Sequence, residues 1–181
     1  IFSHALVFNQ DISKWDTSNV QNMYGLIQNT NEFNQDISTK VVNEGQENDY
    51  IAWDVSNVTS MSGMFSNSNS DVTLKFNYDI TNWNTSNVIG MNSMFYENKS
   101  FNQDISTKEV IVGSKTYTAW DVSNVKDVNQ MFRGATAFNQ PIGNWNTSNI
   151  IYMYQMFSKN RIFNQPIGNW DVSNVTNMKF L

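Results

Sequence analysis

The chain has 181 residues, of which 40% are hydrophobic, and it carries a net charge of −5 with a pI near 4.7. This acidic balance argues against nucleic acid or an anionic membrane surface as a partner, because either would favour a basic stripe, which the sequence does not show. The chain has no cysteine, which excludes disulfides and thiolate metal sites. It also has no apolar run of about 18 residues, so we expect no membrane insertion of this segment.

One phrase recurs from one end of the chain to the other. Trp120, Trp145 and Trp170 are spaced by 25 residues, and the longer spacings between the other tryptophans become the same once extra segments are removed. A period of this size predicts stacked units that are stable only against their neighbours. Copies of the phrase begin at Phe8, Phe33, Phe76, Phe101, Phe138 and Phe163, and their tryptophans are Trp15, Trp53, Trp83, Trp120, Trp145 and Trp170.

Each copy suggests one strand and one helix. Residues 11–16 place apolar Ile12 and Trp15 between polar neighbours, and we expect a short strand there that pairs in parallel with its equivalents. A Ser-Asn-Val or Ser-Asn-Ile phrase follows, and the next apolar residues lie at +3, +6 and +7 from its aliphatic residue. That spacing predicts a helix of about two turns with the serine as its N-cap.

The repeats together predict an α/β solenoid formed by residues 1–181 as a single domain. Ile1-Phe2 matches the Met-Phe pair that closes most copies, so we expect a fragment of a longer array. Two phenylalanine columns should stack as aromatic spines, and asparagine amides should pair from unit to unit. The expected structural ladder comprises the six tryptophans above with Asn19, Asn57, Asn87, Asn124, Asn149 and Asn174.

Two copies carry inserts, at residues 38–50 and 106–117, both between the isoleucine and the tryptophan. Insertions at one fixed point of a repeat emerge on one face, so we expect the two inserts to form a composite patch. Tyrosine is a common contact residue, although the insert tyrosines could equally pack back on the body. The candidate binding residues are Tyr50, Tyr117, Glu44, Glu47 and Lys115.

The sequence does not suggest catalysis. It holds one histidine, His4, and no cysteine, which leaves no triad and no histidine metal site. We therefore expect no enzyme activity, no cofactor and no metal. Two columns of acidic residues raise the alternative of calcium, but turn or cap hydrogen bonds explain them better, since calcium needs six or more oxygens. The columns are Asp11, Asp36, Asp79, Asp104 and Asp16, Asp54, Asp121, Asp171.

Five asparagines are N-glycosylation acceptors by sequence, and Asn98, in the loop after Tyr96, is expected to be the most accessible of them. The others are Asn57, Asn84, Asn146 and Asn174.

In the order and spacing of its Phe, Ile, Trp, Ser-Asn, Val, Met and Met-Phe, the phrase FNQDIS-x-W-D-T/V-SNV-x-x-M-x-x-MF resembles the repeat of the BspA-like leucine-rich-repeat surface proteins. These are also described as mycoplasma-type lipoprotein repeats of unknown function. The resemblance implies a leucine-rich-repeat-like α/β solenoid of about six 25-residue units on a microbial or virus-associated surface. It also implies adhesion or host-protein binding, and it supplies no catalytic residues.

The leading hypothesis is an extracellular or cell-surface module for adhesion or ligand binding, whose partner is another protein or a surface glycan. An alternative is a structural protein that assembles into a sheath or filament. A weaker alternative is binding to ice or a crystal surface through a flat ladder of alternating threonine and valine. That column is Thr17, Val55, Thr85, Val122, Thr147 and Val172.

Overall fold

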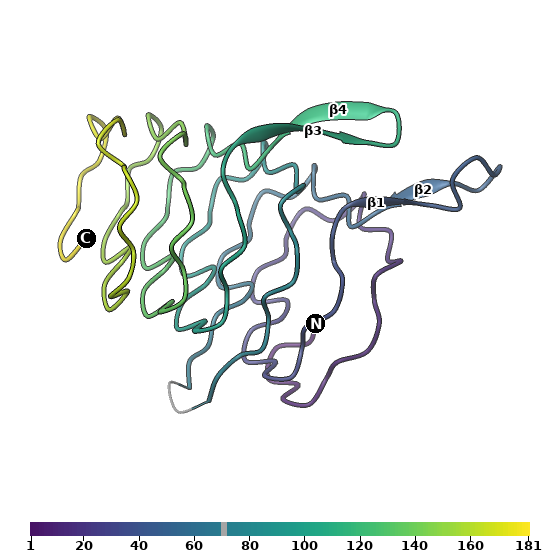
Figure 1. Cartoon of the computed structure of the whole chain (residues 1–181), viewed down its shortest axis with the longest axis horizontal. Coiled ribbons are helices and arrows are strands. Elements are labelled where there is room, and N and C mark those ends of the chain that lie inside the picture. Colours follow the sequence, from purple (N-terminus) through teal and green to yellow (C-terminus); the bar gives the residue numbers. More distant parts are fainter. Residues whose placement is uncertain (70–71) are drawn as a thin grey trace.

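The copies of the repeat lie side by side in chain order. A computed structural model describes residues 1–69 and 72–181, and in Figure 1 the chain advances along its long axis from the N-terminal copies to the C-terminal ones. Single parallel β-bridges join equivalent residues of successive copies, from Asn22 to Ser60 and onward through Gly90, Asp127 and Tyr152 to Asn177.

The predicted α/β solenoid with a strand and a helix in each unit is wrong. The described residues contain no helix, and their strands are four short ones, all within or beside the two inserts. The strands form two separate antiparallel sheets rather than one parallel sheet. Most of each copy is therefore a succession of turns, and the leucine-rich-repeat-like architecture is not present. None of the described residues forms a helix that could cross a membrane.

Backbone conformation explains why the predicted helices do not form. In the second copy, Gly63 lies in the middle of the predicted helix with φ of 63°, in the left-handed region. The amides of Met61, Gly63 and Phe65 donate to carbonyls of the next copy, so they are not available for i−4 bonds along a helix. The amides of Met64 and Ser66 close turns on residues three positions earlier. A right-handed helix cannot contain these left-handed positions.

The predicted strand at residues 11–16 and the predicted serine cap are also wrong. The Trp15 amide donates to the Ile12 carbonyl at 3.1 Å, which closes a turn. The backbone amide of Ser18 donates to Asp16 Oδ1 at 3.0 Å, so the aspartate holds the turn and no helix follows the serine. Asp or Asn before the Ser-Asn phrase plays this role through the same bond in the other copies.

The aromatic spines are confirmed. Phe33 and Phe76 stack with ring centroids 6.1 Å apart in one column, and Phe65 and Phe95 stack at 5.6 Å in the other. The two columns interlock, because Phe65 and Phe76 also stack at 4.0 Å. All four rings are at most 1% exposed, and each buried ring contributes about 1.5–3 kcal/mol. Aromatic stacking thus joins neighbouring copies into one core.

Each insert forms a β-hairpin. In the first, β1 (Lys40–Val42) pairs with β2 (Tyr50–Ala52). In the second, β3 (Lys108–Val112) pairs with β4 (Lys115–Ala119). Both hairpins project from the same side of the stack, and β3–β4 extends over β1–β2 (Figure 1).

Candidate binding site between the two hairpins

A cleft of about 490 Å³ lies between the two hairpins and the body of the stack. Val41 and Tyr50 line it from the first hairpin, and Val112 and Lys115 line it from the second. The hairpins approach closely at this point, because a Cβ atom on Gly113 would lie 2.7 Å from Val41 Cγ2. The glycine at this turn, with φ of 57°, therefore permits both the turn and the contact.

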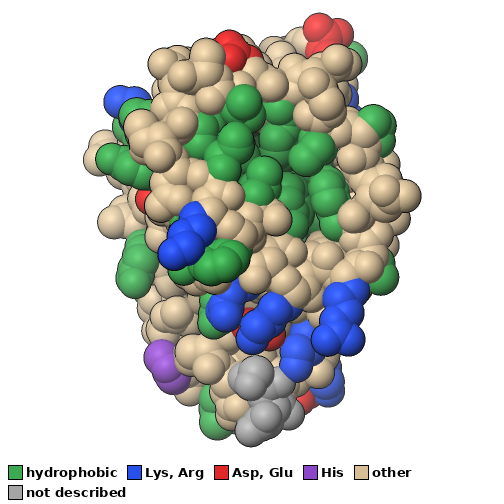
Figure 2. All heavy atoms as spheres, turned by 90° about the vertical axis from the view of Figure 1, so that its left-hand side faces the viewer, with side chains coloured by type: hydrophobic (Ala, Val, Ile, Leu, Met, Phe, Trp, Pro, Cys, Tyr) green, Lys and Arg blue, Asp and Glu red, His purple; other side chains and the backbone are tan. Residues whose placement is uncertain are grey.

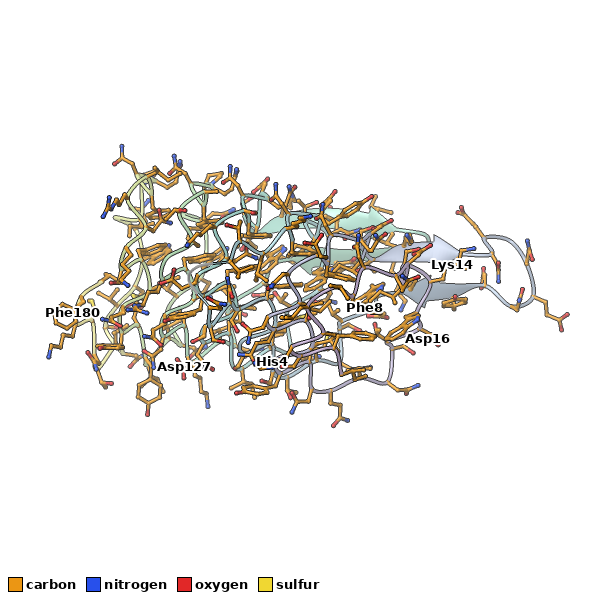
Figure 3. The ribbon with its side chains drawn as sticks, turned by 90° about the horizontal axis from the view of Figure 1, so that it is seen from below. His4, Phe8, Lys14, Asp16, Asp127 and Phe180 are labelled. Carbon is orange, nitrogen blue, oxygen red and sulfur yellow. The ribbon has the colours of Figure 1, made fainter. Side chains whose placement is uncertain are left out.

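Turns of the body form the floor of the cleft. Asp16 and Asp54, from the first two copies, line it, and Figure 3 labels Asp16 and Lys14 near the base of the first hairpin. An adjoining cavity of about 300 Å³ shares Asp54 and Lys115 with the cleft and is also lined by Tyr117. The inserts thus enclose a hollow whose walls come from distant parts of the chain.

The base of each hairpin is fixed to the next copy. Thr39 donates its hydroxyl to the Trp53 carbonyl at 2.8 Å, and the Asn82 amide donates to the Thr39 carbonyl at 2.6 Å. The second hairpin repeats this arrangement with Thr107 and Asn144. In each case an asparagine of the following copy, Asn82 or Asn144, binds the first residues of the hairpin. The hairpins therefore hold a defined position on the stack.

The two insert tyrosines pack back on the body. Tyr50 Oη donates to the Lys14 carbonyl at 2.5 Å, and Tyr117 Oη donates to the Asn82 carbonyl at 2.6 Å. Both side chains are half-buried on β-strands rather than exposed at loop tips. Burial raises the pKa of Tyr117 to about 12. The tyrosines therefore brace the hairpins and contribute ring surface, not free hydroxyls, to the hollow.

The cleft is rich in carboxylates and contains one cation. Lys115 Nζ lies 3.5 Å from Asp54 Oδ2, and the Asp54 side chain is 13% exposed. Asp49 and Glu44 also line the cleft. Glu47 lies in the exposed loop of the first hairpin and does not line it. Four of the five predicted binding residues thus line one or both of the adjoining cavities.

The acidic columns form turns. Asp11, like the other members of its column, accepts a hydrogen bond from the backbone amide two residues on. Hydrogen bonds from Ser13 and Ser18 hold the pKa values of Asp11 and Asp16 below their usual range. No group of three or more potential acidic, histidine or cysteine ligands gathers within residues 1–69 and 72–181. The carboxylates thus contact their own turns, as the turn interpretation predicts.

From the second copy onward, the ladder tryptophans and asparagines donate side-chain hydrogen bonds to backbone carbonyls of the preceding copy. Trp83 Nε1, for example, donates to the Ile37 carbonyl at 2.9 Å. Asn87 Nδ2 donates to the Ser56 carbonyl at 2.7 Å. We expected the asparagine side chains to pair with one another from copy to copy, but the partner of each is a backbone carbonyl. The sequence reasoning missed a second asparagine column in the Phe-Asn-Gln phrase, where Asn34 Oδ1 accepts from the Asn77 amide at 3.0 Å. Its signal was the recurrence of that asparagine in every copy.

Two further expectations are wrong. Asn98 is fully buried, and its Oδ1 accepts hydrogen bonds from the amides of Ser100 and Phe101. It is therefore not the most accessible glycosylation acceptor. The threonine and valine column is no surface ladder either, because Thr85 and Val122 are at most 1% exposed. The Thr85 hydroxyl donates to the Asp121 carbonyl at 2.8 Å inside the stack.

One family model matches the chain over its whole length. It describes a "Mycoplasma protein of unknown function, DUF285", and its three matches span residues 1–51, 39–112 and 108–181. No curated protein and no solved structure matches the chain.

Proposed function

This chain belongs to the family described as Mycoplasma protein of unknown function, DUF285, and we propose that it is a non-catalytic binding module that uses the hollow between its two hairpins. The observation that carries the proposal is the shared cleft, which neither hairpin encloses alone. Its volume of about 490 Å³ falls in the range of about 300–1,000 Å³ typical of ligand sites.

The structure of the walls favours binding over chemistry. The hydroxyls of Tyr50 and Tyr117 donate to backbone carbonyls, and the Asp16 carboxylate accepts from a turn amide. These groups maintain shape, while Val41 and Val112 supply apolar surface. A cleft that combines this apolar surface with several carboxylates and one lysine suits a protruding protein side chain or the hydroxyls of a sugar ring, so the partner is another protein or a surface glycan.

We also propose that the module acts in adhesion at the outside of a cell. The resemblance of the repeat to that of BspA-like surface proteins supports an extracellular or cell-surface location and a role in adhesion. A braced pair of hairpins also suits this role, because rigid contact surfaces lose less entropy when they bind.

A tryptophan placed in the cleft tests the proposal. Ser114 is exposed at the hairpin turn and lines the cleft, whereas Thr118 is exposed on β4 of the same hairpin and lines neither cavity. The native chain, Ser114→Trp and Thr118→Trp would be compared on immobilised extracellular matrix proteins and neutral surface glycans. We expect Ser114→Trp to weaken binding by at least about tenfold and Thr118→Trp to preserve it.

Two results would contradict this function. Equal binding by the Ser114→Trp and native chains would show that the cleft is not the contact surface. A native chain that binds no member of the panel would remove the basis for adhesion. Unchanged thermal unfolding of both variants would show that any difference reflects contact rather than stability.

Structural assembly is the second candidate. The C-terminal face of the stack presents a broad apolar area (Figure 2). Phe180, which Figure 3 labels at the same end of the stack, is 59% exposed. Exposed apolar area of this kind favours contact with a further repeat unit, of the same chain or of a second copy. Sedimentation of the native chain and of Phe180→Ser would test it, and we expect concentration-dependent association only of the native chain. A native chain that stays monomeric would contradict assembly.

A further inference from the structure

The charge of the cleft between the two hairpins indicates which kind of group it takes. Four carboxylates line it, those of Asp16, Glu44, Asp49 and Asp54, and the one cation among its lining residues is Lys115. Four negative charges and one positive charge leave the lining with a net charge of −3. A hollow lined mainly by one sign of charge concentrates ions of the opposite sign. The cleft therefore favours a cationic group over an anionic one.

Most of this negative charge has no cationic partner. The ion pairs formed within residues 1–69 and 72–181 include neither Asp16, Glu44 nor Asp49. Hydrogen bonds from Ser18 hold the pKa of Asp16 below its usual range, so this carboxylate is ionised at neutral pH. Three of the four carboxylates are thus available to an incoming cation.

Lys115 shows that a lysine side chain can enter the cleft. It lies at the start of β4, and its Nζ is 3.5 Å from Asp54 Oδ2. The Asp54 side chain is 13% exposed, and its Oδ1 accepts a hydrogen bond from the Ser56 amide at 3.0 Å. The Lys115 side chain, by contrast, is 59% exposed. A long, exposed ion pair of this kind contributes little free energy, so another cation could displace Lys115 from the fixed carboxylate at small cost.

The apolar walls of the cleft suit the stem of a long basic side chain. Val41 and Ile51 line the cleft from the first hairpin, and Val112 lines it from the second. Lysine and arginine pack their methylene groups on apolar surface while the charged group contacts carboxylates or water. A divalent cation has no such stem and needs oxygens that converge on one point, whereas no three potential acidic, histidine or cysteine ligands gather in the described parts of the chain.

We propose that the cleft takes a lysine or arginine side chain from a loop of a partner protein, and that this side chain displaces Lys115 from Asp54. This inference rests on the proposed function, because it requires the cleft to be the contact surface. It narrows the partner from a protein or a glycan to a protein with an exposed basic side chain. In the free chain, Lys115 occupies part of the site and competes with the ligand.

Two cyclic peptides test the inference, one that displays a single arginine and one that displays citrulline at the same position. Citrulline has the shape of arginine without its charge. Each peptide would be titrated into the native chain labelled with ¹⁵N, and the backbone amide shifts of Gly113 and Lys115 would be followed. At about 50 mM salt we expect the arginine peptide to bind at least about fivefold more tightly, and at about 200 mM salt we expect the difference to narrow.

A charge-matched pair of double variants locates the effect. Glu44→Gln/Asp49→Asn removes two carboxylates from the cleft, whereas Glu47→Gln/Glu109→Gln removes two exposed carboxylates that line neither cavity. We expect the first variant to bind the arginine peptide about fivefold more weakly than the native chain, and the second to lose less than about twofold.

Removing the competing cation should have the opposite sign. We expect Lys115→Met to strengthen binding of the arginine peptide by about threefold, since the methionine keeps an apolar stem but does not compete for Asp54. Lys126→Met removes an exposed cation that lines neither cavity, and it should leave the affinity within about 1.5-fold of the native value.

Several results would overturn the inference. A native chain that binds neither peptide, or both equally, would exclude a basic side chain as the ligand. Equal losses in the two double variants would show that only net charge matters. Weaker binding by Lys115→Met would make Lys115 a contact for the ligand instead of a competitor.

The panel described above separates this inference from the proposed function. If Ser114→Trp weakens binding to a neutral glycan while Glu44→Gln/Asp49→Asn does not, the cleft remains the contact surface and only the basic ligand is excluded. If Ser114→Trp leaves binding of both the panel and the arginine peptide unchanged, the cleft itself is excluded and both proposals fail.

Discussion

Replacing Gly63 with alanine should destabilise the protein, and the sign of the effect tests the fold. Gly63 has φ of 63°, and a Cβ atom there would meet nothing closer than Ser66 Oγ at 3.5 Å. The substitution therefore creates no clash and changes only the backbone preference. A non-glycine residue in the left-handed region costs about 1–2 kcal/mol, and the reduced entropy of the unfolded chain returns about 0.4–1 kcal/mol. The net loss should be about 1 kcal/mol.

Ser93 supplies the matched reverse substitution. It stands at the equivalent place in the next copy with φ of 56°, so Ser93→Gly should relieve strain and stabilise the chain by about 0.5 kcal/mol. A helix would give the opposite pair of signs, because alanine is better than glycine inside a helix by about 1 kcal/mol.

Thermal unfolding followed by tryptophan fluorescence measures both effects. For a chain of this size, 1 kcal/mol corresponds to a Tm change of about 2–4 °C, so Gly63→Ala should lower Tm by about 3 °C and Ser93→Gly should raise it slightly. A higher Tm for Gly63→Ala together with a lower Tm for Ser93→Gly would refute the turn structure of this segment.

Two further predictions concern the hairpin brace and the missed asparagine column. Burial raises the pKa of Tyr117 to about 12, above the value of about 10 for unfolded tyrosine, so its contribution is complete below pH 10 or so and is lost as pH rises to about 12. Tyr117→Phe should reduce the fall in the free energy of unfolding between about pH 10 and about pH 12, measured by denaturant unfolding at each pH. The same pH dependence in the variant and the native chain would contradict this prediction. Asn102→Ala removes the acceptor for Asn139 N and Gln140 Nε2, both at 3.0 Å, and should cost about 1–2 kcal/mol by urea unfolding. Asn149 is exposed and its side-chain amide makes one hydrogen bond of 2.7 Å, so Asn149→Ala should lower the free energy of unfolding by less than Asn102→Ala does. Equal losses in the two variants would argue against a stabilising role for the Phe-Asn-Gln asparagine column.

The location of the candidate site was accessible from the sequence, but the roles of its residues were not. Two inserts at one point of the repeat indicated that both would emerge together, and Tyr50, Glu44 and Lys115 do line the cleft. The direction of each tyrosine depends on hairpin register. Pairing of Val42 with Tyr50 and of Val110 with Tyr117 turns both rings toward the body, and composition does not determine this register.

The helix prediction failed for a reason that applies to other turn-rich repeats. Val58, Met61, Met64 and Phe65 are all fully buried, so the apolar pattern identified the core correctly. Successive β-turns, however, close between residues three apart, as the Met64 amide does on the Met61 carbonyl, and they therefore bring every third residue to one side much as a helix does. Apolar spacing alone cannot separate the two structures. The discriminating signal is the glycine at Gly63 in the middle of the segment, where a helix would lose stability and a left-handed turn would gain it.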